Sequence, residues 1–284
     1  MSTDNAFPGP LASPAWLAEH VGQVLVLDIR SADAFAAGHI PGAVHSDYAA
    51  DGWRVAAGTA GGLLPDVERL AALFGRIGLE PGSPVVVVAA GQAPSDFSAA
   101  ARVYWTLKVS GHRPASILDG GFAAWAGAGL PTAAGPPQPR AAAPYPVHLD
   151  AHIRATAADV ERAVSEHRGG LVDGRSRAQF EGAEKSPQVA RPGRLPGAVH
   201  VDHAQAFEAG TGRLRAPAEL EAVFAPVPQG PTISYCNTGH LASTNWFVLS
   251  EVLKRPGVTL YDGSMSEWAG DPAHPVEAGP TSER

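Results

Sequence analysis

The chain has 284 residues, enough for one large domain or two ordinary ones, and 45% of them are apolar while 17% are charged. This composition is typical of a globular protein with a substantial core. The formal net charge is −7 and Lys and Arg form no runs, which excludes a basic surface for nucleic acid. The single cysteine excludes an intrachain disulfide and any zinc site built from several cysteines.

The N-terminal segment lacks a basic stretch followed by an apolar one, so no secretory signal is expected. No apolar run approaches the length that would span a bilayer. A lone free thiol fits a reducing compartment. We therefore expect a cytoplasmic protein that has neither a membrane nor a nucleic-acid partner.

In chain order, short β-branched runs alternate with amphipathic helical segments. The first half has predicted strands at 24–29 and 85–88, a helix at 98–111, and a strand entering an Asp-Gly turn at 115–125. The second half repeats this order with strands at 171–173 and 232–235, a helix at 242–255, and an Asp-Gly turn within 258–268. Continuous apolar strands separated by helices predict an α/β fold, in which each half is an open parallel sheet flanked by helices.

Longer motifs also recur between the halves. The first half contains "VLVLDIRSADAFAAGHIPGAVHSDYA", and the second contains "GLVDGRSRAQFEG" and, after an insertion, "GRLPGAVHVDHA". A region rich in Pro, Ala and Gly, with no apolar periodicity, separates the two copies. We therefore predict an N-terminal domain over residues 1–132, a linker over 133–149 and a C-terminal domain over 150–284.

The only cysteine, Cys236, stands at the carboxyl end of the predicted strand "TISY", where open α/β sheets bind their ligands. The loop after it consists of Asn237, Thr238, Gly239, His240 and Leu241, and a helix is expected to start near Ala242. Gly239 permits a positive φ, so the loop can turn its backbone amides inward, and the following helix adds unpaired amides. Such a loop stabilises an anion, and the thiolate is the nucleophilic form of cysteine. Cys236 is therefore the candidate catalytic residue.

Four segments, "FAAGHIPGAV", "ILDGGFAAW", "LYDGSMSEW" and "CNTGHLA", together resemble the rhodanese family of sulfurtransferases. The resemblance covers nearly the whole chain and implies two tandem rhodanese-like domains. It implies that the first domain is catalytically inactive, with Ala89 or Ala90 near the cysteine position, and walls one side of the cysteine pocket. It also implies that Cys236 takes a sulfane sulfur from an anionic donor, thiosulfate or 3-mercaptopyruvate. The resulting persulfide passes the sulfur to a thiophilic acceptor such as cyanide or a thiol, with no cofactor and no metal.

The resemblance also predicts the donor-binding residues. Gln179 stands where the family has a substrate-binding arginine, so Arg177 or Arg191 is expected to take over that role. Arg175 matches a family arginine that usually works structurally beside an aspartate, here Asp173. The predicted donor-binding residues are Arg175, Arg177, Gln179 and Arg191, with Asp173 as structural support. The loop residues fit neither the thiosulfate-preferring nor the mercaptopyruvate-preferring pattern in full.

Two other functions use similar sequence features. A cysteine phosphatase also holds a thiolate in a loop before a helix, but it needs an arginine six residues after the cysteine, where this chain has Ala242. A non-catalytic rhodanese-like module for binding or redox sensing would not need a cysteine in such a loop. Both alternatives rank below sulfur transfer.

Overall fold

The computed structural model describes residues 7–138 and 143–280, and the chain divides into two units that exchange short segments. The first unit contains the chain up to Trp53, Asp66–Leu149 and, from the second repeat, Ala209–Arg213. The second unit contains Asp150–Glu208, the chain from Leu214 onward and, from the first repeat, Arg54–Pro65. Each unit therefore includes a short segment encoded within the other repeat.

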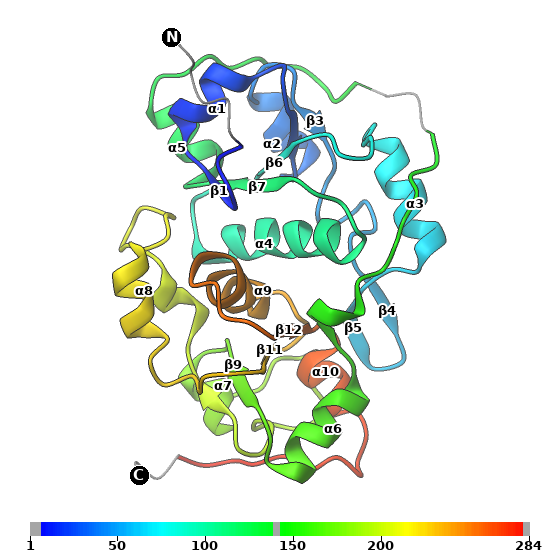
Figure 1. Ribbon diagram of the computed structural model, residues 1–284, viewed down its shortest axis with the longest axis vertical. Helices are drawn as coiled ribbons and strands as arrows, with labels where there is room; N and C mark the ends of the chain where they lie inside the picture. The colour runs from blue at the N-terminus through cyan, green and yellow to red at the C-terminus, as the bar shows by residue number, and fades with distance from the viewer. Residues whose placement is uncertain (1–6, 139–142, 281–284) are drawn as a thin grey trace. The chain divides into compact units, whose positions relative to one another are not determined.

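The first unit is built on a five-stranded parallel sheet with the order β1-β7-β6-β2-β3 (Figure 1). Its strands are β1 (Leu11–Ala12), β2 (Leu25–Asp28), β3 (Val44–His45), β6 (Val85–Val88) and β7 (Ala115–Leu118). Its helices are α1 (Pro14–His20), α2 (Ala32–Ala37), α3 (Val67–Arg76), α4 (Pro94–Val109) and α5 (Gly121–Gly127). Alternate strand residues Val86 and Val88 pack with Leu17 of α1 and Trp125 of α5. Figure 1 shows α4 on the other face of this sheet.

The second unit has the same architecture, with a five-stranded parallel sheet in the order β10-β9-β11-β12-β8. Its strands are β8 (Arg154–Ala155), β9 (Gly170–Asp173), β10 (Val199–His200), β11 (Thr232–Tyr235) and β12 (Val258–Tyr261). Its helices are α6 (Ala157–Glu166), α7 (Arg177–Glu181), α8 (Pro217–Val223), α9 (Ala242–Phe247) and α10 (Ser264–Trp268). There are also two 3₁₀ turns, η1 (Ala151–Ile153) and η2 (His203–Ala206), and α9 continues into a π-helical turn, η3 (Val248–Val252). The predicted α/β class with parallel sheets is confirmed.

The apolar core of the second unit includes the last residue of β11, the strand that ends at the cysteine loop. Phe180, Leu195, Tyr235, Met265 and Trp268 are all fully or almost fully buried and belong to one apolar cluster. Burying a large apolar side chain of this kind contributes about 1.5–3 kcal/mol. This cluster packs the end of β11, the strand that enters the cysteine loop, with residues of α7 and α10. Among the helices of the described residues, none is long and apolar enough to cross a bilayer.

Strand order makes the two sheets directly comparable, with β6 equivalent to β11 and β2 equivalent to β9. In register, Asp28 pairs with Val88, and Asp173 pairs with Tyr235. The residue that follows β6 is Ala89, and the residue that follows β11 is Cys236. Of the two alanines considered from the sequence, Ala89 therefore occupies the position equivalent to the cysteine.

One segment of the second unit comes from early in the chain. β4 (Val55–Ala57) and β5 (Ala60–Leu63) form an antiparallel hairpin, labelled in Figure 1. The paired residues are Val55 with Leu63 and Ala57 with Ala60. The sequence patterns did not predict this hairpin, because its two strands are short and three of its residues are glycines.

Candidate active site

Cys236 is a free cysteine directly after β11, the central strand of the second sheet, and it is only 1% exposed. Its backbone is held by the start of α10. Its amide donates to Ser264 Oγ at 3.1 Å, and its carbonyl accepts from the Met265 amide at 3.1 Å. The carbonyl of Asn237 accepts from the Ser266 amide at 2.9 Å. The first amides of α10 thus fix the two peptide groups that begin the cysteine loop.

Ser264 is an unexpected residue in this arrangement. Its φ is 50°, in the left-handed region that a residue other than glycine rarely occupies. The equivalent residue of the first unit, in the matching Asp-Gly turn, is Gly121 with a φ of 59°. Besides accepting from the Cys236 amide, the Ser264 hydroxyl donates to the Tyr261 carbonyl at 2.8 Å. Backbone strain at such a position is a recurrent feature of functional sites.

The loop itself turns as the sequence predicts. Gly239 has a φ of 69°, and the helix α9 begins at Ala242. The Gly239 carbonyl accepts from Ser243 Oγ at 2.8 Å, and the His240 carbonyl accepts from the Ser243 amide at 3.2 Å. Thr238 is buried and His240 is half-buried. The loop is therefore anchored on one side by α10 and on the other by the first turn of α9.

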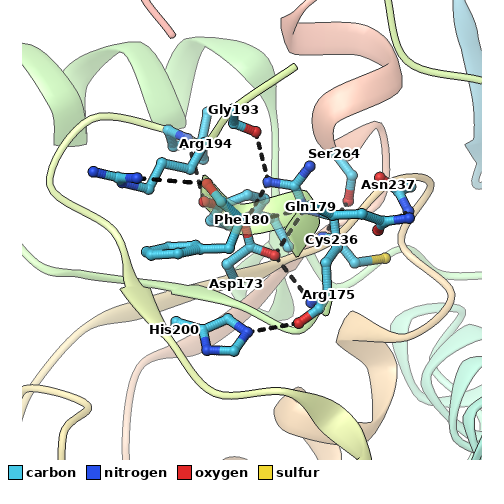
Figure 2. A network of polar contacts seen from close by, with 12 residues as sticks. Asp173, Arg175, Gln179, Phe180, Gly193, Arg194, His200, Cys236, Asn237 and Ser264 are labelled. Carbon is cyan, nitrogen blue, oxygen red and sulfur yellow. Dashed lines mark hydrogen bonds and ion pairs between the residues drawn. The ribbon is translucent and has the colours of Figure 1, made fainter. Parts of the chain in front are cut away.

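Arg175 is part of the scaffold below the loop (Figure 2). Its Nε donates to both oxygens of Asp173 at 2.9 and 3.1 Å, and its Nη2 donates to Asp173 Oδ2 at 2.6 Å and to the Gly193 carbonyl at 2.7 Å. Burial acts to lower the pKa of Arg175, but the charge and hydrogen bonds of Asp173 raise it above its ordinary value. Arg30 and Asp28 form the same bidentate pair in the first unit. The pair occurs in the repeat that has a cysteine and in the repeat that has none. Its role is therefore to stabilise the fold of each unit.

Gln179 is the donor-binding candidate that the structure brings to the loop. Its Oε1 accepts from Asn237 Nδ2 at 2.9 Å, and Figure 2 shows the two side chains meeting beside Cys236. Asn237 Oδ1 is buried and has no hydrogen-bond partner among the described residues. Residue 179, where the resemblance predicts a substrate-binding arginine, is therefore one half of an uncharged amide pair.

The other two arginine candidates make their contacts elsewhere. Arg177 is 57% exposed on the side chain, and its Nη1 lies 3.7 Å from Glu181 Oε1 in the next turn of α7. Residues two apart on a helix point in different directions, so Arg177 and Gln179 do not share a face. Arg191 donates to the carbonyls of Ala269, Asp271 and His274 at 2.6–3.0 Å and so fastens the segment that follows α10. Neither pattern of contacts supports a role in donor binding.

Two features of the site were not predicted from the sequence. The first is Ser264, and its signal was the change from Asp-Gly-Gly in the first half to Asp-Gly-Ser in the second. The second is the β4–β5 hairpin, whose Gly62 lies against Thr238. Nothing in the local pattern of residues 54–65 indicates that this segment packs in the second unit.

The family described as Rhodanese-like domain matches residues 13–128 and 156–271. The thiosulfate sulfurtransferase of Corynebacterium glutamicum is 31% identical over 289 residues, covering 96% of this chain and 92% of that protein. Human 3-mercaptopyruvate sulfurtransferase is 30% identical over 234 residues, covering 81% of this chain and 76% of that protein.

Solved structures agree with this assignment. The 3-mercaptopyruvate sulfotransferase SseA from Escherichia coli superposes with a TM-score of 0.77 at 25% identity, covering 89% of this chain and 98% of that one. The wild-type structure of EanB superposes with a TM-score of 0.80 at 21% identity, covering 95% of this chain and 69% of that one, and so shares the fold. With two domain matches that together span most of its length, the chain belongs to the rhodanese family.

Proposed function

We propose that this protein is a sulfurtransferase that carries a sulfane sulfur on Cys236, from an anionic donor to a thiophilic acceptor. The observation that carries the proposal is the placement of Cys236, buried at the carboxyl end of β11 in a loop whose peptides are held by α9 and α10. A preorganised cradle of amides stabilises negative charge without reorganising during the reaction. Both the thiolate and the persulfide are anions, so one loop serves both states.

The chemistry divides into two displacements at sulfur. In the first, the Cys236 thiolate attacks the outer sulfur of the donor, and a bond forms between Sγ and that sulfur. The bond between the sulfur and the rest of the donor breaks, and its electron pair leaves with sulfite from thiosulfate, or with the carbon fragment that becomes pyruvate from 3-mercaptopyruvate. In the second, cyanide or a thiolate attacks the outer sulfur of the persulfide, and the Cys236 thiolate is released. Each step exchanges one nucleophile for another and needs no external oxidant.

Anion recognition falls to the loop in this proposal. Arg175 is bound to Asp173, Arg177 pairs with Glu181, and Arg191 donates to backbone carbonyls. In this proposal the donor is oriented by the loop of residues 237–241, with His240 and the Gln179–Asn237 pair. Gln179 in place of arginine weakens the attraction for a doubly charged donor, because an amide offers a dipole rather than a charge.

The first unit has a different role, since Ala89 occupies its cysteine position. We propose that this unit forms no persulfide and that the activity belongs to the second unit alone. We also propose that the protein works in a reducing compartment such as the cytoplasm, because Cys236 reacts as a free thiolate.

Mass spectrometry of the intact protein tests the proposal directly. The protein is incubated with thiosulfate and, separately, with 3-mercaptopyruvate, and then with cyanide. We expect a mass gain of one sulfur atom that maps to Cys236 by peptide analysis and disappears when cyanide is added. The faster donor defines the preferred substrate. If neither donor adds sulfur to Cys236 in folded protein, the proposed function is wrong.

A further inference from the structure

The β4–β5 hairpin is tied by hydrogen bonds to the segment that supports the cysteine loop. The Leu64 amide donates to Asp262 Oδ2 at 2.6 Å, and the Gly61 amide donates to Ser266 Oγ at 3.2 Å. Asp262 is almost fully buried, and its two oxygens also accept from Arg154 at 3.0 Å each. A buried carboxylate that binds both a backbone amide and an arginine holds the hairpin in a fixed place.

Ser266 links the hairpin to the loop through a single residue. Its hydroxyl accepts from the Gly61 amide, and its own backbone amide donates to the Asn237 carbonyl at 2.9 Å. The hydroxyl also donates to the Gly263 carbonyl at 2.8 Å, and the side chain is fully buried. The hairpin and the cysteine loop therefore share one support, although Gly61 and Ser266 are 205 positions apart in the chain.

Gly62 makes a closer approach to the loop than any side chain would permit. A Cβ at Gly62 would lie 1.9 Å from the Thr238 carbonyl oxygen and 2.8 Å from its carbonyl carbon. One residue earlier, a Cβ at Gly61 would lie 3.7 Å from Thr238 Cγ2, an ordinary van der Waals distance. The backbone of β5 at Gly62 thus lies directly against the peptide group between Thr238 and Gly239.

Because that peptide group is planar, the contact at the Thr238 carbonyl also fixes the direction of the Gly239 amide. In a trans peptide the C=O and N–H bonds point in opposite directions. The Thr238 carbonyl oxygen lies toward Gly62, so the Gly239 amide points away from the hairpin. The position of the hairpin therefore sets the direction of the Gly239 amide, three residues after Cys236 in the loop.

We propose that Gly62 is a positioning residue for sulfur transfer, which lets β5 press on the Thr238–Gly239 peptide and so aims the Gly239 amide at the anionic sulfur. This inference rests on the proposed function of Cys236 and assigns part of its machinery to the first repeat. Glycine is required at position 62 because any Cβ would displace the Thr238 carbonyl and rotate the amide with it.

The test compares Gly62→Ala with Gly61→Ala in the full-length protein. Both changes add one methyl group to the same strand, but only the first meets the loop backbone. We expect Gly62→Ala to lower kcat/KM for the sulfur donor by up to about 100-fold, the effect of a misplacement of about 1 Å near the reacting atoms. We expect Gly61→Ala to stay within about twofold of the unsubstituted protein, because ordinary contacts need no backbone shift.

A second readout does not depend on sulfur transfer. The rate of Cys236 alkylation by iodoacetamide is measured against pH, and the half-maximal point should move to higher pH in Gly62→Ala but not in Gly61→Ala. A change confined to Gly62→Ala supports the positioning role even if neither donor loads sulfur, so the two proposals fail separately. Equal pH profiles and equal kcat/KM in both folded variants would overturn the role of Gly62.

A third variant covers the case in which Gly62→Ala does not fold. Ser266→Ala removes the hydroxyl that accepts from the Gly61 amide but adds no atom to the crowded contact. Circular dichroism and thermal unfolding establish that it is folded. We expect its alkylation profile to move in the same direction as that of Gly62→Ala, by a smaller amount. A folded Ser266→Ala protein with an unshifted profile and unchanged kcat/KM would refute the proposal.

Discussion

Ser264 combines an unfavourable backbone conformation with two hydrogen bonds at the cysteine loop, and two substitutions separate these contributions. Ser264→Ala keeps the positive φ and removes the hydroxyl. Ser264→Gly removes the hydroxyl and also relieves the strain. The Cys236 amide donates to Ser264 Oγ at 3.1 Å, so both variants leave that amide without its acceptor.

The expected magnitudes follow from these contacts. A buried amide that loses its acceptor costs about 1–3 kcal/mol, and the bond to the Tyr261 carbonyl adds about 0.5–1.5 kcal/mol. We therefore expect Ser264→Ala to lower the free energy of unfolding by about 2–4 kcal/mol. Left-handed backbone costs a residue with a Cβ about 1–2 kcal/mol. Glycine recovers that cost but is more flexible in the unfolded chain, so Ser264→Gly should be more stable than Ser264→Ala by about 0.5–1 kcal/mol.

The activities of Ser264→Ala and Ser264→Gly should not follow their stabilities. Both variants lose the bond that fixes the Cys236 amide, so both should lower kcat/KM by about 10- to 100-fold, the usual effect of a small misplacement of a reacting group. Urea unfolding gives the stabilities, and steady-state kinetics with the preferred donor give the activities. Wild-type kcat/KM in Ser264→Gly would show that the hydroxyl does not position the cysteine. Wild-type stability in Ser264→Ala would show that its hydrogen bonds contribute nothing.

Four further substitutions have expected outcomes. Cys236→Ser should fold normally but transfer no sulfur, because a serine alkoxide is not accessible at neutral pH. Measurable turnover by this variant would contradict the mechanism. Arg175→Ala should lower the free energy of unfolding by about 3–5 kcal/mol, because Asp173 stays buried without its partner. Urea unfolding measures this loss, and an unchanged transition midpoint would argue against the scaffold role of Arg175. Gln179→Arg should raise kcat/KM for thiosulfate, because it places a positive charge beside Asn237. Arg177→Ala should change kcat/KM by less than about twofold, because the Arg177 side chain is exposed and pairs with Glu181. If steady-state kinetics showed a large loss of kcat/KM in Arg177→Ala and no gain in Gln179→Arg, Arg177 would be the donor-binding residue.

The features predictable from the sequence are those that depend on neighbouring residues. Runs such as Val85–Val88 and Thr232–Tyr235 are short, apolar and flanked by helical patterns, so they identify buried parallel strands. The position of Cys236 at a strand end follows from the same local pattern, and so does the turn at Gly239. Both repeats also show an aspartate two residues before an arginine, which predicts the Asp173–Arg175 pair.

The features that could not be predicted depend on residues far apart in the chain. Three acceptor carbonyls of Arg191 come from residues 269–274, and no pattern around position 191 indicates them. Side-chain direction on the short helix α7 decides that Gln179 and not Arg177 meets Asn237, and the sequence alone does not give that direction. The contact of Gly62 with Thr238 requires knowledge of which unit a hairpin joins.

The exchange of segments between the units has a consequence for biosynthesis. The segment Arg54–Pro65 leaves the ribosome well before the cysteine loop and α10, on which its hairpin packs. In the other direction, the first unit includes Ala209–Arg213, and a Cβ at Gly212 would lie 2.5 Å from the Gly91 carbonyl oxygen. Domains generally fold as units during synthesis, starting from the N-terminus. Here the first unit is complete only after residue 213 has been made, and a gene cut between residues 149 and 150 would yield two proteins that each lack a piece of their own fold.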